Sequence, residues 1–335
     1  MKKEKPQQLI VFDMDGVLID VSASYREVVR QTARAFFQPA QASSELPDPL
    51  FSLSELAAVK QGGGLNNDWD LTYFIIQLLF ALVEKPPQSE ENKSDWNGYC
   101  QRLSRCNVGG LVKFLQSQKN PLASLLKNNK KPGDSFIRKL SGKDVGSGNI
   151  IKQIFQEFYL GRDLFGATYG MLPQVYSGEG YIHRETLMVD KALLEKLAKY
   201  HMLAVATGRP KQEADFALDR HDIRKYFDAV YTLEDCIQEE KRILDQEGRR
   251  VSLSKPAPYM LDAIAGYIQP RPLIAYYLGD MPDDMIAAGR SRSGFVGIGL
   301  VSSAPDKQVL RRELLRAGAD YIIEDLKQVE EIVAV

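Results

Sequence analysis

The sequence predicts an α/β protein with two parts: a doubly wound, Rossmann-like parallel-sheet core and an enlarged α-helical cap domain inserted into it. Near the N-terminus, the short apolar run Leu9–Phe12 ends in carboxylates. From about residue 187, short apolar runs alternate with helical patterns, as in βαβ units. Roughly 165 mainly helical residues separate the first strand from the next. They are too long for an ordinary loop, so we expect an inserted domain.

The composition is that of an ordinary soluble protein. Of the 335 residues, 44% are hydrophobic and 26% are charged, and 43 Lys and Arg residues nearly balance 44 Asp and Glu residues. A net charge of -1 offers no basic surface for nucleic acid or for an anionic membrane, so we expect neither as a partner. No stretch approaches the ~18 apolar residues of a membrane-spanning helix.

The N-terminus and the cysteines indicate where the protein resides. The basic start is followed by an apolar run that is too short for a signal peptide, so we expect no targeting segment. Cys100, Cys106 and Cys236 have spacings that match neither a zinc site nor a disulfide framework. We therefore expect a cytoplasmic protein with reduced thiols.

The first strand delivers two carboxylates, Asp13 and Asp15, and then Gly16. Open α/β sheets bind ligands beyond the carboxyl ends of their strands, and a glycine there permits a tight turn. Taken alone, the motif has a second interpretation as an acidic surface turn, because a strand followed by Asp and Gly is common turn punctuation.

We expect the core to consist of residues 1–20 and 187–335, and the insertion to span residues 21–186. Two capping boxes, Ser24 with Glu27 and Ser52 with Glu55, predict helix starts in the insertion.

Further along the insertion, a glycine run at residues 62–64 breaks the second helix, and a strongly apolar helix follows Asn67 or Asp68. Residues 88–148 are polar and the hardest to interpret. Another amphipathic helix begins at Ile150, and we expect it to end at Gly161.

The rest of the core follows in chain order. We expect a helix capped by Asp190, strands at 202–206, 229–231, 273–278, 295–298 and 321–323, and helices at 258–268, 283–290 and 306–317.

Polar residues recur where these strands end. Thr207 and Gly208 follow one strand, and Asp280 follows another, with Asp283 and Asp284 close behind. Because parallel strands share one carboxyl edge, these groups should lie near Asp13 and Asp15.

Lys255 precedes a helix and is flanked by prolines. A cation among so many carboxylates would neutralise part of their repulsion. Carboxylates, a hydroxyl and a lysine at one edge suit Mg²⁺ bound to a phosphate. The sequence therefore predicts a Mg²⁺ cofactor that is itself bound to a phosphate group.

The set resembles the signature of the haloacid dehalogenase superfamily of phosphohydrolases. Its four parts match, in order, Asp13-Met14-Asp15-Gly16, Thr207, Lys255 and the run from Gly279 to Asp284. A helical insertion after the first motif resembles the subfamily of phosphoglycolate phosphatase and β-phosphoglucomutase. The insertion departs from that subfamily by being about twice the expected size.

The resemblance implies a role for each residue. Asp13 would be the nucleophile and a metal ligand, and Asp15 the general acid and base, offering its backbone carbonyl to Mg²⁺. Asp280 would complete the metal ligands. Thr207, Gly208 and Lys255 would hold the phosphate, and Asp284, with Asp283, would orient Lys255 or a metal-bound water.

The reaction class follows from the same residues. An acid at Asp15 suits phosphate esters, because a halide leaving group needs no proton. The favoured function is a Mg²⁺-dependent phosphatase acting on a small phosphorylated metabolite. The alternatives are a sugar-phosphate mutase, which returns the phosphoryl group to its substrate, and a catalytically silent metabolite-binding or interaction subunit. Oligomeric state is not indicated.

Substrate choice is expected to come from the insertion. Lys60, Asn66, Asn67 and Asp68 flank the glycine break, where related caps have a turn that contacts the substrate. Arg209 is the best further anion contact, with a surface arginine at a helix start as the alternative interpretation. The histidines and tryptophans are expected to be structural or surface residues.

We predict that Lys60→Ala and Asn67→Ala lower kcat/KM for the physiological substrate by about tenfold, the scale of one lost charged hydrogen bond. Hydrolysis of a small generic phosphate should change little, because it lacks the group that these side chains would hold. Steady-state kinetics with both substrates tests this. Equal losses on both would move the specificity site elsewhere.

Overall fold

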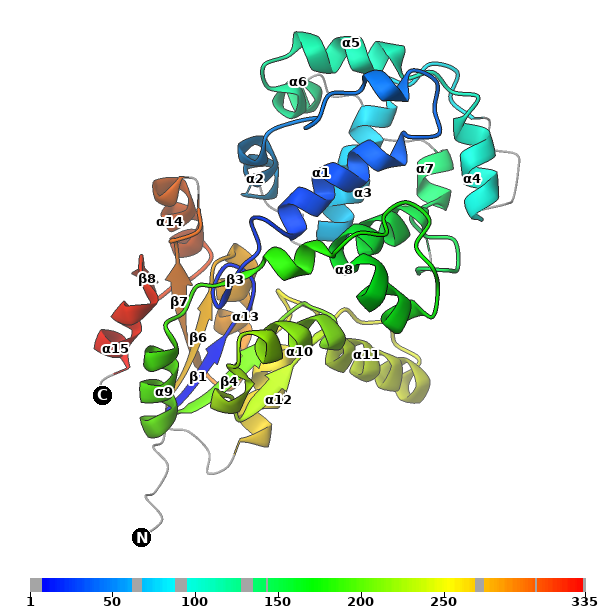
Figure 1. Cartoon of the computed structure of the whole chain (residues 1–335). Helices are drawn as coiled ribbons and strands as arrows, with labels where there is room; N and C mark the ends of the chain where they lie inside the picture. The colour runs from blue at the N-terminus through cyan, green and yellow to red at the C-terminus, as the bar shows by residue number, and fades with distance from the viewer. Residues whose placement is uncertain are drawn as a thin grey trace. The chain divides into compact units, whose positions relative to one another are not determined.

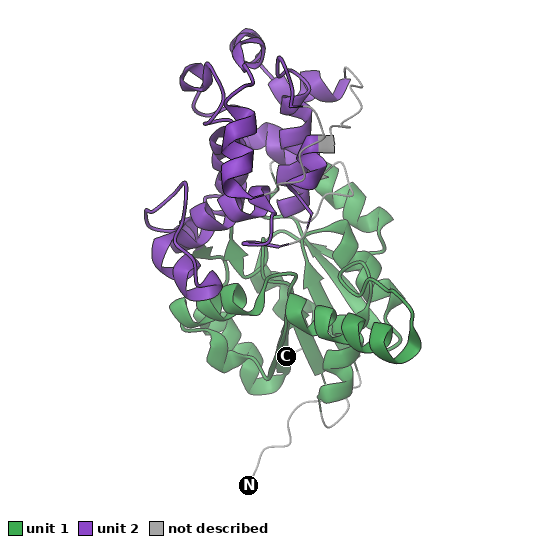
Figure 2. Cartoon of the chain, turned by 90° about the vertical axis from the view of Figure 1, so that its right-hand side faces the viewer, with its two compact units in different colours: residues 1–21, 186–335 green, residues 22–185 purple. Residues whose placement is uncertain are grey.

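The structure, a computed structural model, describes residues 8–61, 68–87, 95–127, 135–142, 144–268, 274–304 and 306–333. The chain divides into two compact units, which Figure 2 distinguishes by colour. Unit 1 combines Met1–Val21 with Thr186–Val335, and unit 2 is Ser22–Glu185.

Unit 1 contains a six-stranded sheet in the order β5-β4-β1-β6-β7-β8, and all of its pairings are parallel. This confirms the α/β class and the doubly wound parallel sheet. Its strands are β1 (Gln8–Phe12), β4 (Met202–Ala206), β5 (Ala229–Tyr231), β6 (Ile274–Gly279), β7 (Phe295–Leu300) and β8 (Tyr321–Ile323).

The central strand β1 is apolar because both of its faces are covered. Leu9–Phe12 are at most 1% exposed, as expected for a parallel strand between helical layers. Figure 1 shows α9 in front of the sheet and α12 behind it. The helices of unit 1 are α9 (Lys191–Tyr200), α10 (Lys211–Arg220), α11 (Leu233–Glu247), α12 (Tyr259–Tyr267), α13 (Pro282–Arg290), α14 (Lys307–Arg316) and α15 (Val329–Ile332).

Acidic side chains fix the starts of several of these helices. Asp190 accepts a hydrogen bond from the amide of Ala192 at 2.9 Å, which confirms the predicted cap of α9. Asp306 accepts from the amides of Gln308 and Val309, both at 3.0 Å, at the start of α14.

Two helices of unit 1, α10 and α11, were not predicted from the sequence pattern.

A second, two-stranded sheet lies where the chain leaves unit 1 and returns to it. β2 (Ile19–Asp20) pairs antiparallel with β3 (Thr186–Leu187). The amide of Gly16 donates to the carbonyl of Ile19 at 2.8 Å, so the turn after β1 is tied to this sheet. Such short strands carry no periodicity, and the sequence did not predict them.

Unit 2 is helical in its described part. α1 packs against both α3 and α8, and the buried rings of Tyr25 and Tyr159 stack with centroids 4.3 Å apart. Its helices are α1 (Tyr25–Phe36), α2 (Leu53–Gln61), α3 (Asp68–Phe80), α4 (Trp96–Leu103), α5 (Gly109–Ser117), α6 (Pro121–Lys127), α7 (Ser135–Lys139) and α8 (Ile150–Tyr169).

One of the two predicted capping boxes is present and the other is wrong. Ser52 and Glu55 bond each other's backbone amides at 3.2 Å, as predicted for the start of α2. Ser24 precedes α1 but makes no side-chain cap. Its hydroxyl donates instead to Glu185 at 2.9 Å, and Glu27 pairs with Arg30. The Ser24 hydroxyl therefore bonds a buried carboxylate 161 residues away and does not cap the local helix.

The predicted end of α8 at Gly161 is also wrong. Gly161 leaves the helical conformation, with φ 70° and ψ 177°, but the helix resumes and continues to Tyr169, with Gly170 in the left-handed conformation after it. A Cβ on Gly161 would lie 2.2 Å from the amide nitrogen of Gly180. The glycine therefore lets another segment of unit 2 approach a kink in the helix.

We predict that Gly161→Ala destabilises unit 2 by more than about 2 kcal/mol, because the substitution adds a clash with backbone to a conformation that only glycine adopts readily. Gly170→Ala is the matched control. Its φ is 64°, yet a Cβ there meets nothing within 4 Å, so we expect a loss of only about 1 kcal/mol. Urea unfolding followed by circular dichroism measures both. Equal losses would contradict the role of the close approach.

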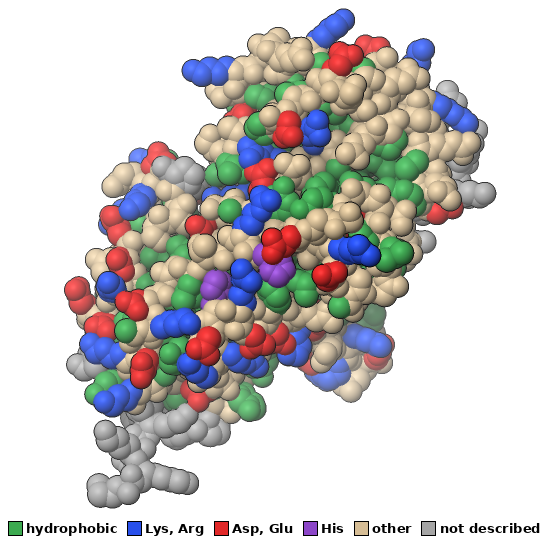
Figure 3. Space-filling model, in the orientation of Figure 1, with side chains coloured by type: hydrophobic (Ala, Val, Ile, Leu, Met, Phe, Trp, Pro, Cys, Tyr) green, Lys and Arg blue, Asp and Glu red, His purple; other side chains and the backbone are tan. Residues whose placement is uncertain are grey.

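Charge and hydropathy set the character of the surface. In the described parts of the chain, no helix has the length and apolarity needed to cross a membrane. On the face seen in Figure 3, acidic and basic side chains are interspersed over unit 1.

Candidate active site

The carboxyl edge of the sheet gathers polar groups from three strands. Asp13 follows β1, Thr207 follows β4 and Asp280 follows β6, and these residues are 6%, 1% and 8% exposed. The amide of Asp13 donates to the carbonyl of Leu278 at 2.8 Å, which extends the β1–β6 pairing to the start of the motif. The three groups therefore lie at one level of the sheet, as the strand-end argument predicts.

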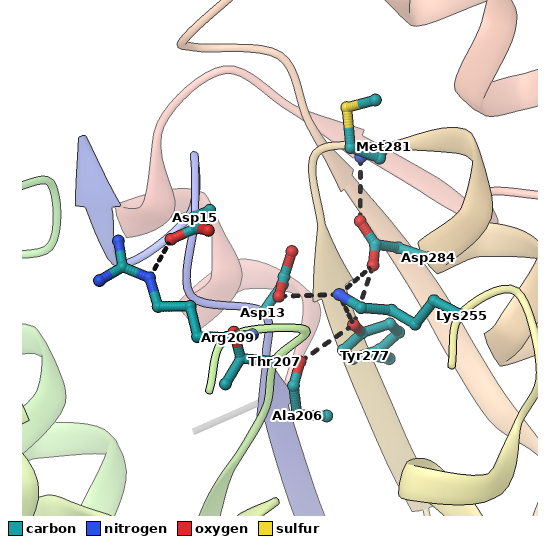
Figure 4. Close-up of polar contacts among 9 residues, drawn as sticks. All are labelled: Asp13, Asp15, Ala206, Thr207, Arg209, Lys255, Tyr277, Met281 and Asp284. Atoms are coloured by element: carbon teal, nitrogen blue, oxygen red, sulfur yellow. Dashed lines mark hydrogen bonds and ion pairs between the residues drawn. The ribbon is translucent and has the colours of Figure 1, made fainter. Parts of the chain in front are cut away.

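Lys255 links two of the carboxylates. Its ammonium lies 2.8 Å from Oδ1 of Asp13 and 2.8 Å from Oδ1 of Asp284. The side chain of Asp284 is 1% exposed and that of Lys255 is 16% exposed. Figure 4 shows the ammonium between the two carboxylates.

Tyr277 is a member of this network that sequence reasoning missed. Its hydroxyl accepts from the Lys255 ammonium at 3.0 Å, donates to Oδ1 of Asp284 at 2.9 Å and lies 3.4 Å from the carbonyl oxygen of Ala206. In the sequence, Tyr277 resembles the apolar residues around it in β6. Its hydroxyl could have indicated a role in the network, because a buried tyrosine hydroxyl needs a hydrogen-bond partner.

The second oxygen of Asp284 has a structural task. It accepts from the amide of Met281 at 3.0 Å and so caps the start of α13. Asp284 thus fixes the lysine with one oxygen and its own helix with the other. Asp283 is half-buried beside it.

Burial shifts the pKa values of this network. Loss of solvation raises the pKa of Asp13 to about 8, and the carboxylates of Asp284, Asp15 and Asp280 add to the shift while Lys255 opposes it. Burial would lower the pKa of Lys255, but the attraction of Asp13 and Asp284 outweighs it and holds the pKa well above the usual value. The site is thus rich in negative charge relative to its positive charge.

The carboxylates suit a divalent cation. Asp13, Asp280 and Asp284 each present an oxygen, and these three oxygens lie within 4.8 Å of one another. Hard, oxygen-rich donor sets of this kind are what Mg²⁺ prefers. Burial is the main cause of the raised pKa of Asp13, and a cation here would offset the smaller contribution from repulsion by the neighbouring carboxylates. Since both oxygens of Asp284 already have partners, Asp13 and Asp280 are the better candidate ligands.

Gly16 lets Asp280 reach the first motif. Its φ is +74°, and a Cβ at this position would lie 2.1 Å from Oδ2 of Asp280. The glycine therefore serves two needs, the tight turn and the approach of a carboxylate from another strand.

Asp15 has a different partner from Asp13. Its Oδ1 lies 2.6 Å from Nε of Arg209, and it is Arg209 that is buried, with a side chain 1% exposed against 32% for Asp15. Figure 4 shows Asp15 turned toward Arg209 while Asp13 points toward Lys255.

The remaining predicted residues are placed as follows. The amide of Arg209 donates to Oγ1 of Thr207 at 3.1 Å, and Gly208 between them is exposed. Asp68 is half-buried as the first residue of α3. Lys60 belongs to α2, but its side chain, together with Asn66 and Asn67, lies outside the described residues.

Comparison with known proteins adds one curated relative. No model of a protein family matches the chain. A protein of Phytophthora nicotianae named imidazoleglycerol-phosphate dehydratase is 24% identical over 299 residues, which cover 89% of this chain and 44% of that protein. The chain therefore spans less than half the length of this relative.

Solved structures share the fold over nearly the whole chain. A structural genomics target solved by X-ray crystallography superposes with a TM-score of 0.64 at 18% identity, covering 98% of each chain. Phosphatase Tt82 from Thermococcus thioreducens gives 0.50 at 21% identity, covering 92% of this chain and 99% of its own. A predicted phosphoglycolate phosphatase from Haemophilus somnus 129pt gives 0.50 at 15% identity, covering 97% of each chain.

The chain therefore shares its fold with these solved structures, two of which are named as phosphatases, in agreement with the fold that the resemblance of the four motifs implies. Its helical unit is inserted between the first strand of the sheet and the later ones. At these identities the similarity establishes the fold alone.

We predict that Mg²⁺ raises the unfolding temperature of the wild type and that Gly16→Ala abolishes this rise, because the added methyl group displaces Asp280. Gly208→Ala is the control, since a Cβ there meets nothing within 4 Å. Differential scanning calorimetry with and without Mg²⁺ measures the shift. A normal shift in Gly16→Ala would remove Asp280 from the metal site.

Proposed function

We propose that the protein is a Mg²⁺-dependent phosphatase that hydrolyses a small phosphorylated metabolite through a phosphorylated Asp13. The observation that carries this proposal is the joining of Asp13, Lys255 and two further buried carboxylates at the carboxyl edge of the sheet. Unit 1 would be the catalytic core and unit 2 the cap that chooses the leaving group.

Asp13 is proposed as the nucleophile. Its carboxylate oxygen would attack phosphorus, forming an O–P bond while the bond from phosphorus to the leaving oxygen breaks. Water would then attack the same phosphorus and break the O–P bond to Asp13, which restores the carboxylate and releases inorganic phosphate. The ion pair with Lys255 at 2.8 Å supports this role, because it fixes the direction of the carboxylate.

Asp15 is proposed as the general acid and base. It would donate a proton to the leaving oxygen in the first step and take one from the attacking water in the second. Its position two residues after Asp13, in the turn that Gly16 closes, supports this assignment.

The positive charges are proposed to serve the phosphate group. When bound, Mg²⁺ would neutralise phosphate oxygens and polarise the phosphorus centre. Asp13 and Asp280 would hold it with their side chains, and Asp15 with its backbone carbonyl, as the family resemblance implies. Lys255, the hydroxyl of Thr207 and the exposed backbone of Gly208 would bind the remaining phosphate oxygens.

A screen of phosphorylated metabolites would identify the substrate. The name of the Phytophthora nicotianae relative refers to an imidazole-bearing phosphate ester, so imidazoleglycerol phosphate belongs in a panel with sugar phosphates and phosphoglycolate. Release of free phosphate separates a phosphatase from a mutase, because a mutase returns the phosphoryl group to its substrate. A binding subunit would release none.

We predict that the wild type releases phosphate from at least one panel member with Mg²⁺ and that Asp13→Asn abolishes turnover, because an amide cannot attack phosphorus. Excess EDTA should suppress the wild-type rate, since the carboxylate cluster otherwise repels the substrate phosphate. A phosphate-release assay measures each rate, and circular dichroism checks that Asp13→Asn is folded. Full activity in EDTA, or in Asp13→Asn, would refute the mechanism.

A further inference from the structure

We propose that Arg209 is a positioning residue for Asp15. Its buried guanidinium would hold the carboxylate of the general acid and base in one orientation beside the phosphate-binding edge. This inference rests on the proposed function, because it concerns the residue to which proton transfer is assigned there. It also reassigns Arg209, which the sequence suggested as a contact for a substrate anion.

The first support is the contact itself. Nε of Arg209 lies 2.6 Å from Oδ1 of Asp15, within the range of a charge-assisted hydrogen bond. The Arg209 side chain is 1% exposed, and a buried guanidinium needs a fixed ionic or hydrogen-bonding environment. With so little exposure and its Nε bonded to Asp15, Arg209 is poorly placed to receive a substrate.

The second support is that the backbone of Arg209 is fixed on both sides. Its amide donates to Oγ1 of Thr207 at 3.1 Å, and its carbonyl accepts from the amide of Leu233 at the start of α11 at 3.0 Å. The guanidinium therefore projects from a segment tied to the proposed phosphate-binding residue.

The third support is the freedom that Asp15 would otherwise have. Its side chain is 32% exposed, and an exposed Asp samples several rotamers. An acid and base that must face a leaving oxygen and then a water loses rate when it is misdirected. The two carboxylates of the motif thus have separate cations, Lys255 for Asp13 and Arg209 for Asp15, as Figure 4 shows.

The test compares two aryl phosphates that differ in their need for a proton. 4-Nitrophenyl phosphate has a leaving group that departs with little protonation, whereas phenyl phosphate needs an acid. We expect Arg209→Gln to lower kcat/KM for phenyl phosphate at least about tenfold more than for 4-nitrophenyl phosphate, through kcat and with KM little changed. Arg209→Lys, which keeps the charge, should lose less.

Two further variants sharpen the result. Asp15→Asn should show the same preference for the better leaving group, and adding Arg209→Gln to it should cost little more, because both changes remove one function. Arg224→Gln is the matched control. It breaks an arginine–aspartate pair of 3.1 Å with Asp215 elsewhere in unit 1, and should leave both rates unchanged.

A purely structural role for Arg209 predicts equal losses on both esters, and a substrate contact predicts a rise in KM. Either result overturns the proposal. Crystal structures of the wild type and Arg209→Lys give a readout besides activity. Asp15 should keep its orientation in Arg209→Lys and change rotamer in Arg209→Gln, whose structure is solved alongside, and an unchanged carboxylate in Arg209→Gln overturns the proposal. If the wild type hydrolyses no phosphate ester, the proposed function fails, while this structural comparison still decides whether Arg209 positions Asp15.

Discussion

The ion pairs of Lys255 are the interaction on which the rest of the site depends. A parallel sheet brings its strand ends to one edge, and here that edge receives Asp13, Asp280 and Asp284 together. At an effective dielectric constant of 20, two unit charges 4 Å apart interact by about 4 kcal/mol, a sizeable part of the stability of a whole domain. Such a cluster is unfavourable without positive charge, and Lys255 supplies it between Asp13 and Asp284.

The same constraint explains two glycines at the ends of the strands. Carboxylates from another strand or from the next helix must approach the backbone there, and a side chain would block them. Gly16 leaves room for Asp280, and a Cβ on Gly279 would lie 2.3 Å from the Cβ of Asp284. Close packing of backbone against carboxylate is thus built into both the first and the last motif.

Most of the core was predictable because its signals are local. The strands 202–206, 229–231 and 321–323 have the predicted bounds, since each apolar run is bounded by polar residues. The strand ends also predicted which residues meet. What the sequence could not show depends on distant partners: Ser24 bonds Glu185, and Arg209 bonds Asp15 across 194 residues.

Other elements were not predicted because their sequences show no clear pattern of apolar residues. α10 buries mainly small residues and Glu213, so it shows no clear apolar stripe, and β2 and β3 are too short for any alternation. The role of Tyr277 was missed for a third reason. The sequence shows an aromatic residue in a strand, but it does not show that the hydroxyl bonds Asp284.

Buried carboxylates in the two units differ in what they bond. Glu157 in unit 2 is fully buried, and its described hydrogen bonds come from neutral donors: the side-chain amide of Gln153 and the backbone amides of Val175 and Tyr176. Neutral donors satisfy a fixed charge and hold a segment in place. Asp13 and Asp15 bond cations instead. A cation can offset negative charge over a longer distance than an amide dipole can, which matters where several carboxylates lie close together. The cations at the sheet edge therefore offset the mutual repulsion of the carboxylates that gather there.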